Sequence, residues 1–198
     1  YRSKTSSFCQ TPFNSVSISV HIAIAHYGVA GDVSGVTTWL SGLVTVARSK
    51  GHSLDLIIHH FGGDPNDGSF LKENGAYAGL LTPVKPQWTE HAVQQTIAFL
   101  NKGRPQIFLP QCLAGFHFAA RFCEQYGLPW VLTVHSDDPI YWGLLEESAP
   151  KSSLGIVVVV SDYLNREVRR RGLAQDPITI PYGVTAPSFH ARFDRNPF

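Results

Sequence analysis

The sequence lacks an excess of charge of either sign, and this excludes several classes of partner. Among its 198 residues, 16 Lys and Arg side chains are balanced by 15 Asp and Glu, for a formal net charge of +1. A chain with this balance carries no global field of the kind that holds nucleic acid or anionic lipid. Any basic binding surface must therefore be local.

Cysteine and long apolar runs are also scarce. Cys9, Cys112 and Cys123 are an odd set without a C-x-x-C pair, which favours a reduced, cytoplasmic interior over a disulfide framework or a zinc site. The apolar runs at 18–25 and 156–160 are far shorter than the roughly 20 residues of a membrane-spanning helix. Residues before position 16 lack a signal-peptide pattern. We expect a cytoplasmic protein, either free or peripheral at the inner face of the membrane.

Apolar periodicity alternates between strand and helix along most of the chain. Strand patterns occur at 16–25, 53–60, 76–84, 107–109, 131–134, 155–160 and 177–181, and helical patterns at 36–47, 88–101, 113–126, 141–147 and 162–171. Such alternation predicts right-handed crossovers between parallel strands. The predicted fold is α/β, a doubly wound, mostly parallel, Rossmann-like sheet with helices on both faces. We expect an N-terminal extension at 1–15, this domain at 16–185 and the start of a linker at 186–198.

Residue types mark several of the predicted helix boundaries. Gly51, Gly103 and Gly172 follow helical patterns and are placed as helix stops. Ser161 is well placed to cap the helix after the most apolar strand, with Asp162 in the first turn of that helix.

The run at 131–139 reads Val-Leu-Thr-Val-His-Ser-Asp-Asp-Pro, a buried type of strand that ends abruptly in ionisable groups. Ligands of open α/β sheets bind outside the carboxyl ends of the strands. His135 at this point can donate to a phosphate or a sugar hydroxyl, act as an acid or base, or bond a neighbouring backbone group. Asp137 and Asp138 can bind sugar hydroxyls, although an aspartate before Pro139 is also ordinary in turns.

A glycine-containing loop joins the first predicted strand to the first predicted helix. Backbone N–H groups and a helix N-terminus at such a place can hold a phosphate. Gly28, Gly31 and Gly35 do not spell the dinucleotide fingerprint, and no Gly-Lys-Ser/Thr of a P-loop follows. The loop is therefore either a phosphate contact or a plain structural turn.

Two kinds of active site are excluded. The elbow G-x-S-x-G of a serine hydrolase is absent around Ser34. His59 and His60 are adjacent on a strand and point to opposite faces, and Cys112 and His117 lie five residues apart on a predicted helix. No metal site is predicted.

A local basic cluster lies on the last predicted helix, at Arg166, Arg169, Arg170 and Arg171. Most runs of this kind are solvated helix faces. The alternative is a contact for an anionic acceptor or a membrane surface.

Four segments occur in an order that is typical of a known family. The first is a glycine loop with Gly35-Val36, followed by a helix that ends in Lys50-Gly51-His52. The other three are the run at 132–138, Val160-Ser161-Asp162-Tyr163-Leu164, and Ile180-Pro181-Tyr182-Gly183-Val184. Over 16–185 this series resembles the N-terminal half of a GT-B glycosyltransferase of the group 1, or family 4, type. The resemblance implies a retaining, metal-independent transfer of a sugar from a nucleotide-sugar donor, in a cleft between two Rossmann-like domains. No cofactor is expected besides the donor, which is a substrate.

The resemblance also assigns roles to residues. The glycine loop of the family approaches the donor diphosphate, which maps to Gly31, Ser34 and Gly35. The histidine after the strand lies against the donor sugar, which maps to His135. The N-terminal domain mainly recognises the acceptor, so we predict further substrate contacts at Asp137, Asp138 and Ser161.

The chain departs from the family pattern at two places and in its extent. The family usually has paired glycines where this chain has Ser34-Gly35, and asparagine where it has Tyr182. A C-terminal domain with two glutamates holds the nucleotide and most of the donor sugar, and no residues follow Phe198 in this sequence to supply it. We therefore expect an acceptor-side domain that is inactive by itself and has the missing domain as a partner.

Two other functions stay open. A sugar-nucleotide 2-epimerase shares the two-domain architecture, although no carboxylate and histidine set of that family is recognised in this chain. A non-catalytic sugar-binding module could have kept the fold and lost the chemistry.

Overall fold

A computed structural model describes residues 18–28, 35–60, 81–84, 88–111 and 114–182. Along the chain the elements are β1 (His21–Gly28), α1 (Gly35–Ser49), β2 (Ser53–His60), β3 (Leu81–Val84), α3 (Thr89–Gly103), β4 (Ile107–Pro110), α4 (Ala114–Glu124), β5 (Trp130–Val134), α5 (Pro139–Ser148), β6 (Gly155–Val159), α6 (Asp162–Arg170) and β7 (Ile178–Thr179). The predicted N-terminal extension and linker lie outside the described residues. No helix in the described part is long and apolar enough to cross a membrane.

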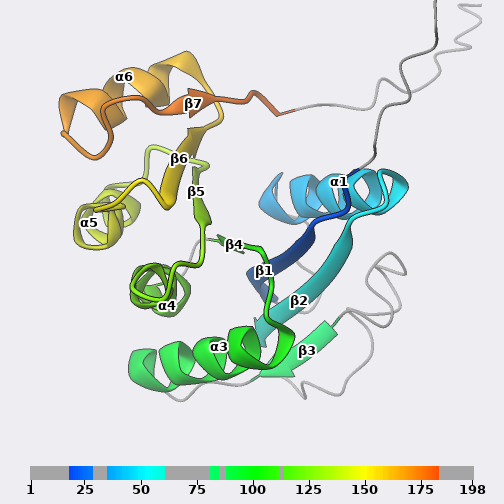
Figure 1. Cartoon of the computed structure of the whole chain (residues 1–198). Coiled ribbons are helices and arrows are strands. Elements are labelled where there is room, and N and C mark those ends of the chain that lie inside the picture. The colour runs from blue at the N-terminus through cyan, green and yellow to red at the C-terminus, as the bar shows by residue number, and fades with distance from the viewer. Residues whose placement is uncertain (1–17, 29–34, 61–80, 85–87, 112–113, 183–198) are drawn as a thin grey trace, which may run out of the picture.

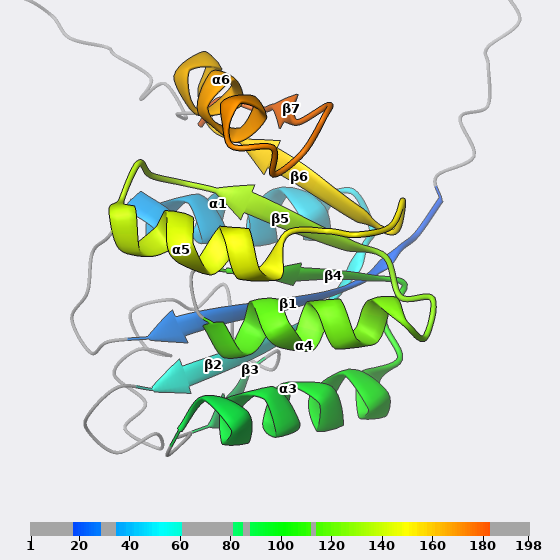
Figure 2. The ribbon, with the colours of Figure 1, turned by 90° about the vertical axis from the view of Figure 1, so that its left-hand side faces the viewer.

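The strands form one sheet in the order β3-β2-β1-β4-β5-β6-β7, and each described strand pair is parallel. Helix α1 covers one face of this sheet, whereas α3, α4 and α5 lie side by side on the other (Figures 1 and 2). Figure 2 shows the arrowheads of β1, β2 and β5 at the same edge. The predicted doubly wound, Rossmann-like α/β fold is confirmed.

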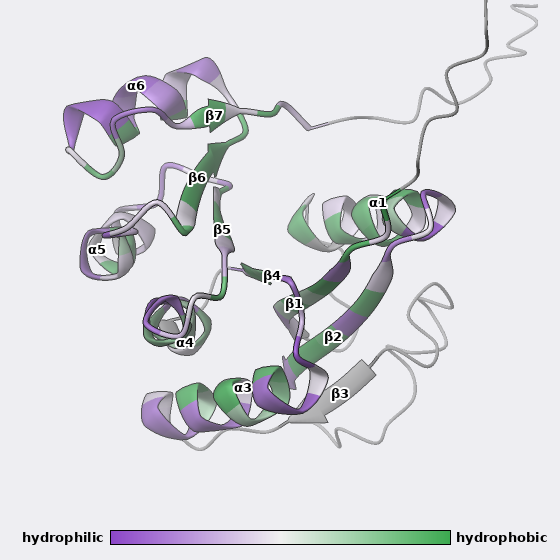
Figure 3. Cartoon of the chain, in the orientation of Figure 1, coloured by the Kyte–Doolittle hydropathy of each residue, from purple (hydrophilic) through white to green (hydrophobic). Residues whose placement is uncertain are grey.

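The two faces of the sheet carry separate hydrophobic cores because side chains alternate along each strand. In β2, Leu56 and Ile58 pack with Leu40 and Val44 of α1, while Ile57 belongs to the larger core beneath α3 and α4. Figure 3 shows β6 in green and α6 largely in purple, so the apolar residues gather in the sheet. Burial on both sides is typical of parallel strands.

Strand β1 is displaced toward the C-terminus relative to the strand predicted at 16–25. It runs from His21 to Gly28, with His26 beside Ile58 and Tyr27 beside His59 in the parallel register with β2. The local pattern is less apolar after Ala25, but pairing with the neighbouring strand continues the ladder. His26 and Tyr27 are therefore strand residues, which the prediction had placed after the strand.

The predicted helix ends are confirmed with one correction. Gly51 and Gly172 have φ angles of +80° and +69°, and Ser161 Oγ accepts the Leu164 N–H at 3.2 Å, as a helix N-cap should. Gly103, in contrast, is still helical, and Arg104 takes the left-handed conformation with φ of 48°. A Cβ at position 103 would lie 2.6 Å from Asp55 Oδ2, the end of a partly exposed side chain, and Gly103 is not the residue that turns the chain here.

The contact between α3 and α4 depends on Gly115. A Cβ at this position would lie 2.5 Å from Ala92 Cβ, and neither helix can move away without loosening the core. We expect Gly115→Ala to lower the free energy of unfolding by about 1–3 kcal/mol, as overpacking does. Urea unfolding measures the change.

Gly42→Ala in α1 is the matched control. No atom lies within 4 Å of a Cβ at that position, so alanine should raise the stability by roughly 0.5–1 kcal/mol through its helix propensity. A stability loss in Gly42→Ala equal to that in Gly115→Ala would refute the packing explanation.

Candidate functional site

His135 lies at the carboxyl edge of the sheet, and both of its ring nitrogens are bonded to residues distant in sequence. Its Nε2 lies 2.6 Å from Gln111 Oε1, across 24 residues, and its Nδ1 lies 2.5 Å from Tyr182 Oη, across 47 residues. Gln111 follows β4, His135 follows β5 and Tyr182 follows β7. The parallel order of these strands is what brings the three side chains together.

Two aromatic rings enclose the imidazole. Trp39 of α1 meets it edge-on, with ring centroids 5.0 Å apart, and Tyr182 stacks on it at 5.8 Å with an interplanar angle of 11°. Burial lowers the pKa of His135 from 6.5 to about 4. The side chain is therefore a neutral imidazole near pH 7, not a cation.

Further histidines lie buried near the same edge. His26 of β1, His59 of β2 and His117 of α4 are at most 1% exposed. The pKa of His26 and that of His59 are lowered to about 4 and that of His117 to about 3, chiefly by burial, with a smaller contribution from His135 for His26 and His117. Both ring nitrogens of His26 and of His117 are without a hydrogen-bond partner. Unpartnered buried groups of this kind destabilise a fold by roughly 1–3 kcal/mol each.

The predicted phosphate contact is only partly described. Gly35 is the first residue of α1 and is exposed, and a Cβ there would have no atom within 4 Å. The first backbone N–H groups of a helix have no partner within it and attract anions. Gly31 and Ser34 lie outside the described residues, and their contact with a diphosphate stays a prediction.

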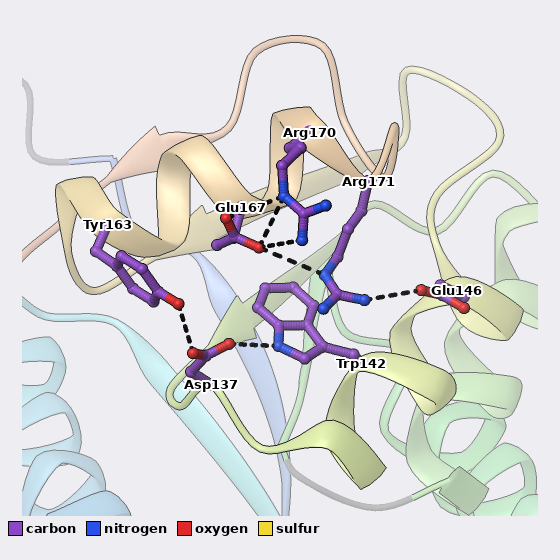
Figure 4. A network of polar contacts seen from close by, with 7 residues as sticks. All are labelled: Asp137, Trp142, Glu146, Tyr163, Glu167, Arg170 and Arg171. Carbon is purple, nitrogen blue, oxygen red and sulfur yellow. Dashed lines mark hydrogen bonds and ion pairs between the residues drawn. The ribbon is translucent and has the colours of Figure 1, made fainter.

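Asp137 lies in a polar network that joins the end of β5 to α5 and α6 (Figure 4). Its Oδ1 accepts a bond from Trp142 Nε1 and its Oδ2 one from the Tyr163 hydroxyl, both at 2.6 Å. The bonds from Tyr163 and Trp142 lower the pKa of this carboxyl group. Asp137 therefore has a structural role, and its predicted contact with substrate is untested.

The other two predicted substrate contacts are also untested. Ser161 uses its hydroxyl as an acceptor in the cap of α6. Asp138 is exposed beside Asp137, and its backbone carbonyl accepts the Trp142 N–H at 3.0 Å. Both residues follow strands at the same edge as His135.

The basic cluster on α6 is largely paired within the chain. The ion pairs are Arg169–Asp176 (3.5 Å), Arg170–Glu167 (2.6 Å) and Arg171–Glu146 (3.2 Å). The Arg171 guanidinium also lies beside the Trp142 ring (Figure 4), and its central carbon is 4.5 Å from the ring centroid. These contacts favour the interpretation as a solvated helix face.

Sequence reasoning missed Gln111, Trp39 and His26 as neighbours of this site. Gln111 carries the signal that identified His135, since it is a polar residue directly after a buried strand. Trp39 lies within the helical pattern at 36–47, where an apolar residue indicates core packing and not a site. Tyr182 was noted as a departure from the family pattern but not as a partner of His135.

A parallel sheet of this order, with polar groups and a helix N-terminus at its carboxyl edge, is typical of domains that bind a ligand in a crevice at that edge. The sequence model of Glycosyltransferase Family 4 matches residues 33–186. The chain belongs to this family, as the motif series predicted. A comparison with curated proteins found no match.

Solved structures share the fold at low sequence identity. The lipopolysaccharide outer core galactosyltransferase WaaB in its apo form aligns with a TM-score of 0.59 and 14% identity, over 81% of this chain and 44% of WaaB. The UDP-GlcNAc 2-epimerase from Methanocaldococcus jannaschii aligns with a TM-score of 0.60 and 10% identity, over 81% of this chain and 45% of the epimerase. Anabaena HepE in complex with UDP-glucose aligns with a TM-score of 0.56 and 11% identity, over 82% of this chain and 44% of HepE. The chain thus spans less than half the length of these proteins.

The buried histidines make the fold sensitive to acid. Their pKa values are lowered by burial, so between about pH 6.5 and pH 4 the unfolded chain binds protons that the folded chain does not. Stability should therefore fall as the pH is lowered through this range. Urea unfolding at a series of pH values measures the slope.

The variant His117→Leu tests the cause of this acid sensitivity. It removes one buried titrating group, so the slope should decrease by up to about 1.4 kcal/mol per pH unit, the equivalent of one proton. At pH 7 the variant should be at least as stable as the wild type, because two unpartnered nitrogens are removed. An unchanged slope would contradict the assignment.

The Asp137 network should stabilise the chain through the buried Trp142. Asp137→Ala leaves the indole N–H of Trp142, which is 3% exposed, without its acceptor. We expect a lower melting temperature for this variant, and a smaller decrease for Asp137→Asn, which keeps an acceptor oxygen. Thermal unfolding followed by circular dichroism measures both, and equal decreases would show that the indole bond does not matter.

Proposed function

We propose that this chain is the acceptor-side domain of a retaining glycosyltransferase that moves a sugar from a nucleotide-sugar donor to a glycan, lipid or small-molecule acceptor. The single observation that carries the proposal is the enclosed, neutral His135 at the carboxyl edge, in a chain that belongs to Glycosyltransferase Family 4. Ligands of open α/β sheets bind at this edge.

The proposed roles follow from the positions of the residues. The N-terminus of α1 at Gly35, together with Gly31 and Ser34, would hold the donor diphosphate through backbone N–H groups. His135 would contact the donor sugar. Nearby Asp138 would offer an acceptor oxygen to hydroxyls of the acceptor.

Asp137 and Ser161 would act on substrate alongside their structural bonds. Each oxygen of a carboxylate has two lone pairs, so Asp137 can accept a further bond besides those from Trp142 and Tyr163. A hydroxyl that accepts in a helix cap still has its own proton to donate, which leaves Ser161 able to bond a substrate oxygen. No metal or other cofactor enters the proposed reaction.

The 2-epimerase remains the second candidate, because an epimerase shares the fold as closely as the transferases do. Fold alone does not separate the two activities. The family match favours transfer over epimerisation. A non-catalytic binding module would have the same fold and site without turnover.

The purified 198-residue chain should not transfer sugar by itself, because it spans less than half the length of the enzymes it resembles. Incubation with UDP-glucose, UDP-galactose and UDP-GlcNAc, followed by chromatography of the nucleotide and sugar products, measures this. Transfer by the chain alone would contradict the acceptor-domain assignment, and conversion of UDP-GlcNAc to its 2-epimer would favour the epimerase.

When the chain is combined with a donor-binding domain, His135→Ala should lower kcat/KM by roughly 10²-fold, the effect expected for loss of one group that contacts the reacting sugar. His52→Ala is the matched control, since His52 lies between α1 and β2 at the opposite edge of the sheet. A fully active His135→Ala variant would remove the role of this residue in transfer. A complex that binds donor and acceptor without turnover would identify a binding module.

A further inference from the structure

The two bonds to the His135 ring define which nitrogen carries the proton. Gln111 presents its amide oxygen to Nε2 at 2.6 Å, and an amide oxygen can only accept. In the orientation that the structure gives the Gln111 amide, Nε2 carries the proton and donates it. In a neutral imidazole the other nitrogen, Nδ1, is then an acceptor, so the Tyr182 hydroxyl at 2.5 Å donates to it.

The two partners are held to very different degrees. Gln111 is completely buried, and its backbone N–H donates to the Ala25 carbonyl at 2.9 Å, which ties it to β1 at the centre of the sheet. Tyr182 is 39% exposed and lies after the short strand β7. A ligand can therefore reach the imidazole from the Tyr182 side and not from the Gln111 side.

A protonated Nε2 and an accepting Nδ1 also restrict the chemistry of that ligand. A hydroxyl can donate to Nδ1 as Tyr182 does, whereas a deprotonated phosphate oxygen is itself an acceptor and finds no proton there. Of the roles open to His135 from the sequence, the contact with a sugar hydroxyl fits this tautomer and donation to a phosphate does not.

We propose that the Tyr182 hydroxyl occupies the position of a sugar hydroxyl on His135 Nδ1, and that a bound sugar displaces it while Gln111 keeps the tautomer unchanged. This inference rests on the proposed function and deepens it. Tyr182 and Gln111 are positioning residues in this scheme. Since the hydroxyl of Tyr182 competes with the ligand, the residue at position 182 sets the affinity of the site.

Imidazole ¹⁵N NMR of the full 198-residue chain with labelled histidine tests the tautomer. In the wild type His135 should show a protonated Nε2 and a hydrogen-bonded, accepting Nδ1 at pH 7. In Tyr182→Phe, which keeps the stacked ring, the tautomer should persist while the Nδ1 resonance moves to that of an unbonded acceptor. A protonated Nδ1 in the wild type, or an unchanged Nδ1 in Tyr182→Phe, would overturn the proposal.

A second variant isolates the role of Gln111. Gln111→Leu removes the amide acceptor, so His135 should become a mixture of the two tautomers. Retention of the wild-type tautomer in a folded Gln111→Leu chain would show that Gln111 does not determine it. Should this buried substitution prevent folding, Tyr182→Phe still decides the proposal, because it changes only one exposed hydroxyl.

Ligand titrations on the same resonances test the exchange. Glucose, which offers hydroxyls, should perturb Nδ1 of His135, and dimethyl phosphate, a phosphodiester without a P–OH group at pH 7, should not. Tyr182→Phe should bind glucose about 2- to 10-fold more tightly, the fold-change that corresponds to not breaking one hydrogen bond. A response to dimethyl phosphate and not to glucose would refute the exchange.

The failure of this proposal is distinguishable from that of the proposed function. Equal glucose affinities in the wild type and Tyr182→Phe, with His135 perturbed in both, would overturn displacement and leave the sugar contact intact. If neither glucose nor UDP-glucose perturbs His135 in either protein, also when each is combined with a donor-binding domain, both the exchange and the proposed role of His135 in sugar transfer are wrong.

Discussion

The interior strand β1, buried on both faces and paired in parallel on both sides, is the element on which the other features depend. Ala23, Ile24 and Ala25 are at most 1% exposed, with the alanines in the core under α3 and α4 and the isoleucine in the core under α1. Because β2 and β4 both run parallel to β1, the sheet extends outward with every carboxyl end at one edge. The site at that edge is a consequence of this pairing.

Near this edge the fold buries polar side chains that have unpartnered atoms, in place of apolar ones. His26 and His117 are completely buried, and their ring nitrogens have no hydrogen-bond partner. The amide nitrogen of the buried Gln111 also has none. Local conflicts of this kind are expected at functional sites, where stability is exchanged for a chemical environment. Burial at this edge also lowers the pKa of His135 and keeps its imidazole neutral.

The network around Asp137 supports the same edge from the other side. It links the segment after β5 to α5 through Trp142 and to α6 through Tyr163, and the Arg171 guanidinium covers the Trp142 ring. Arg171, which follows α6, thus supports the Trp142 side of this network, while Arg169 and Arg170 lie on the solvated face of the helix. A neutral imidazole held between fixed elements is suited to recognising a hydroxyl by hydrogen bonding, which agrees with membership of a glycosyltransferase family.

The sequence by itself determined the order of strands and helices, the class of fold, the capped start of α6 and the place of His135 at a strand end. These features depend on periodicity and residue types within a few positions, which is information a local pattern contains. The tertiary structure decided that β1 continues through His26, that Arg104 rather than Gly103 turns the chain after α3, and that Asp137 bonds Trp142 and Tyr163. It also brought Gln111 and Tyr182 to His135 from 24 and 47 residues away, because such contacts depend on which strands are neighbours, and no local pattern contains that information.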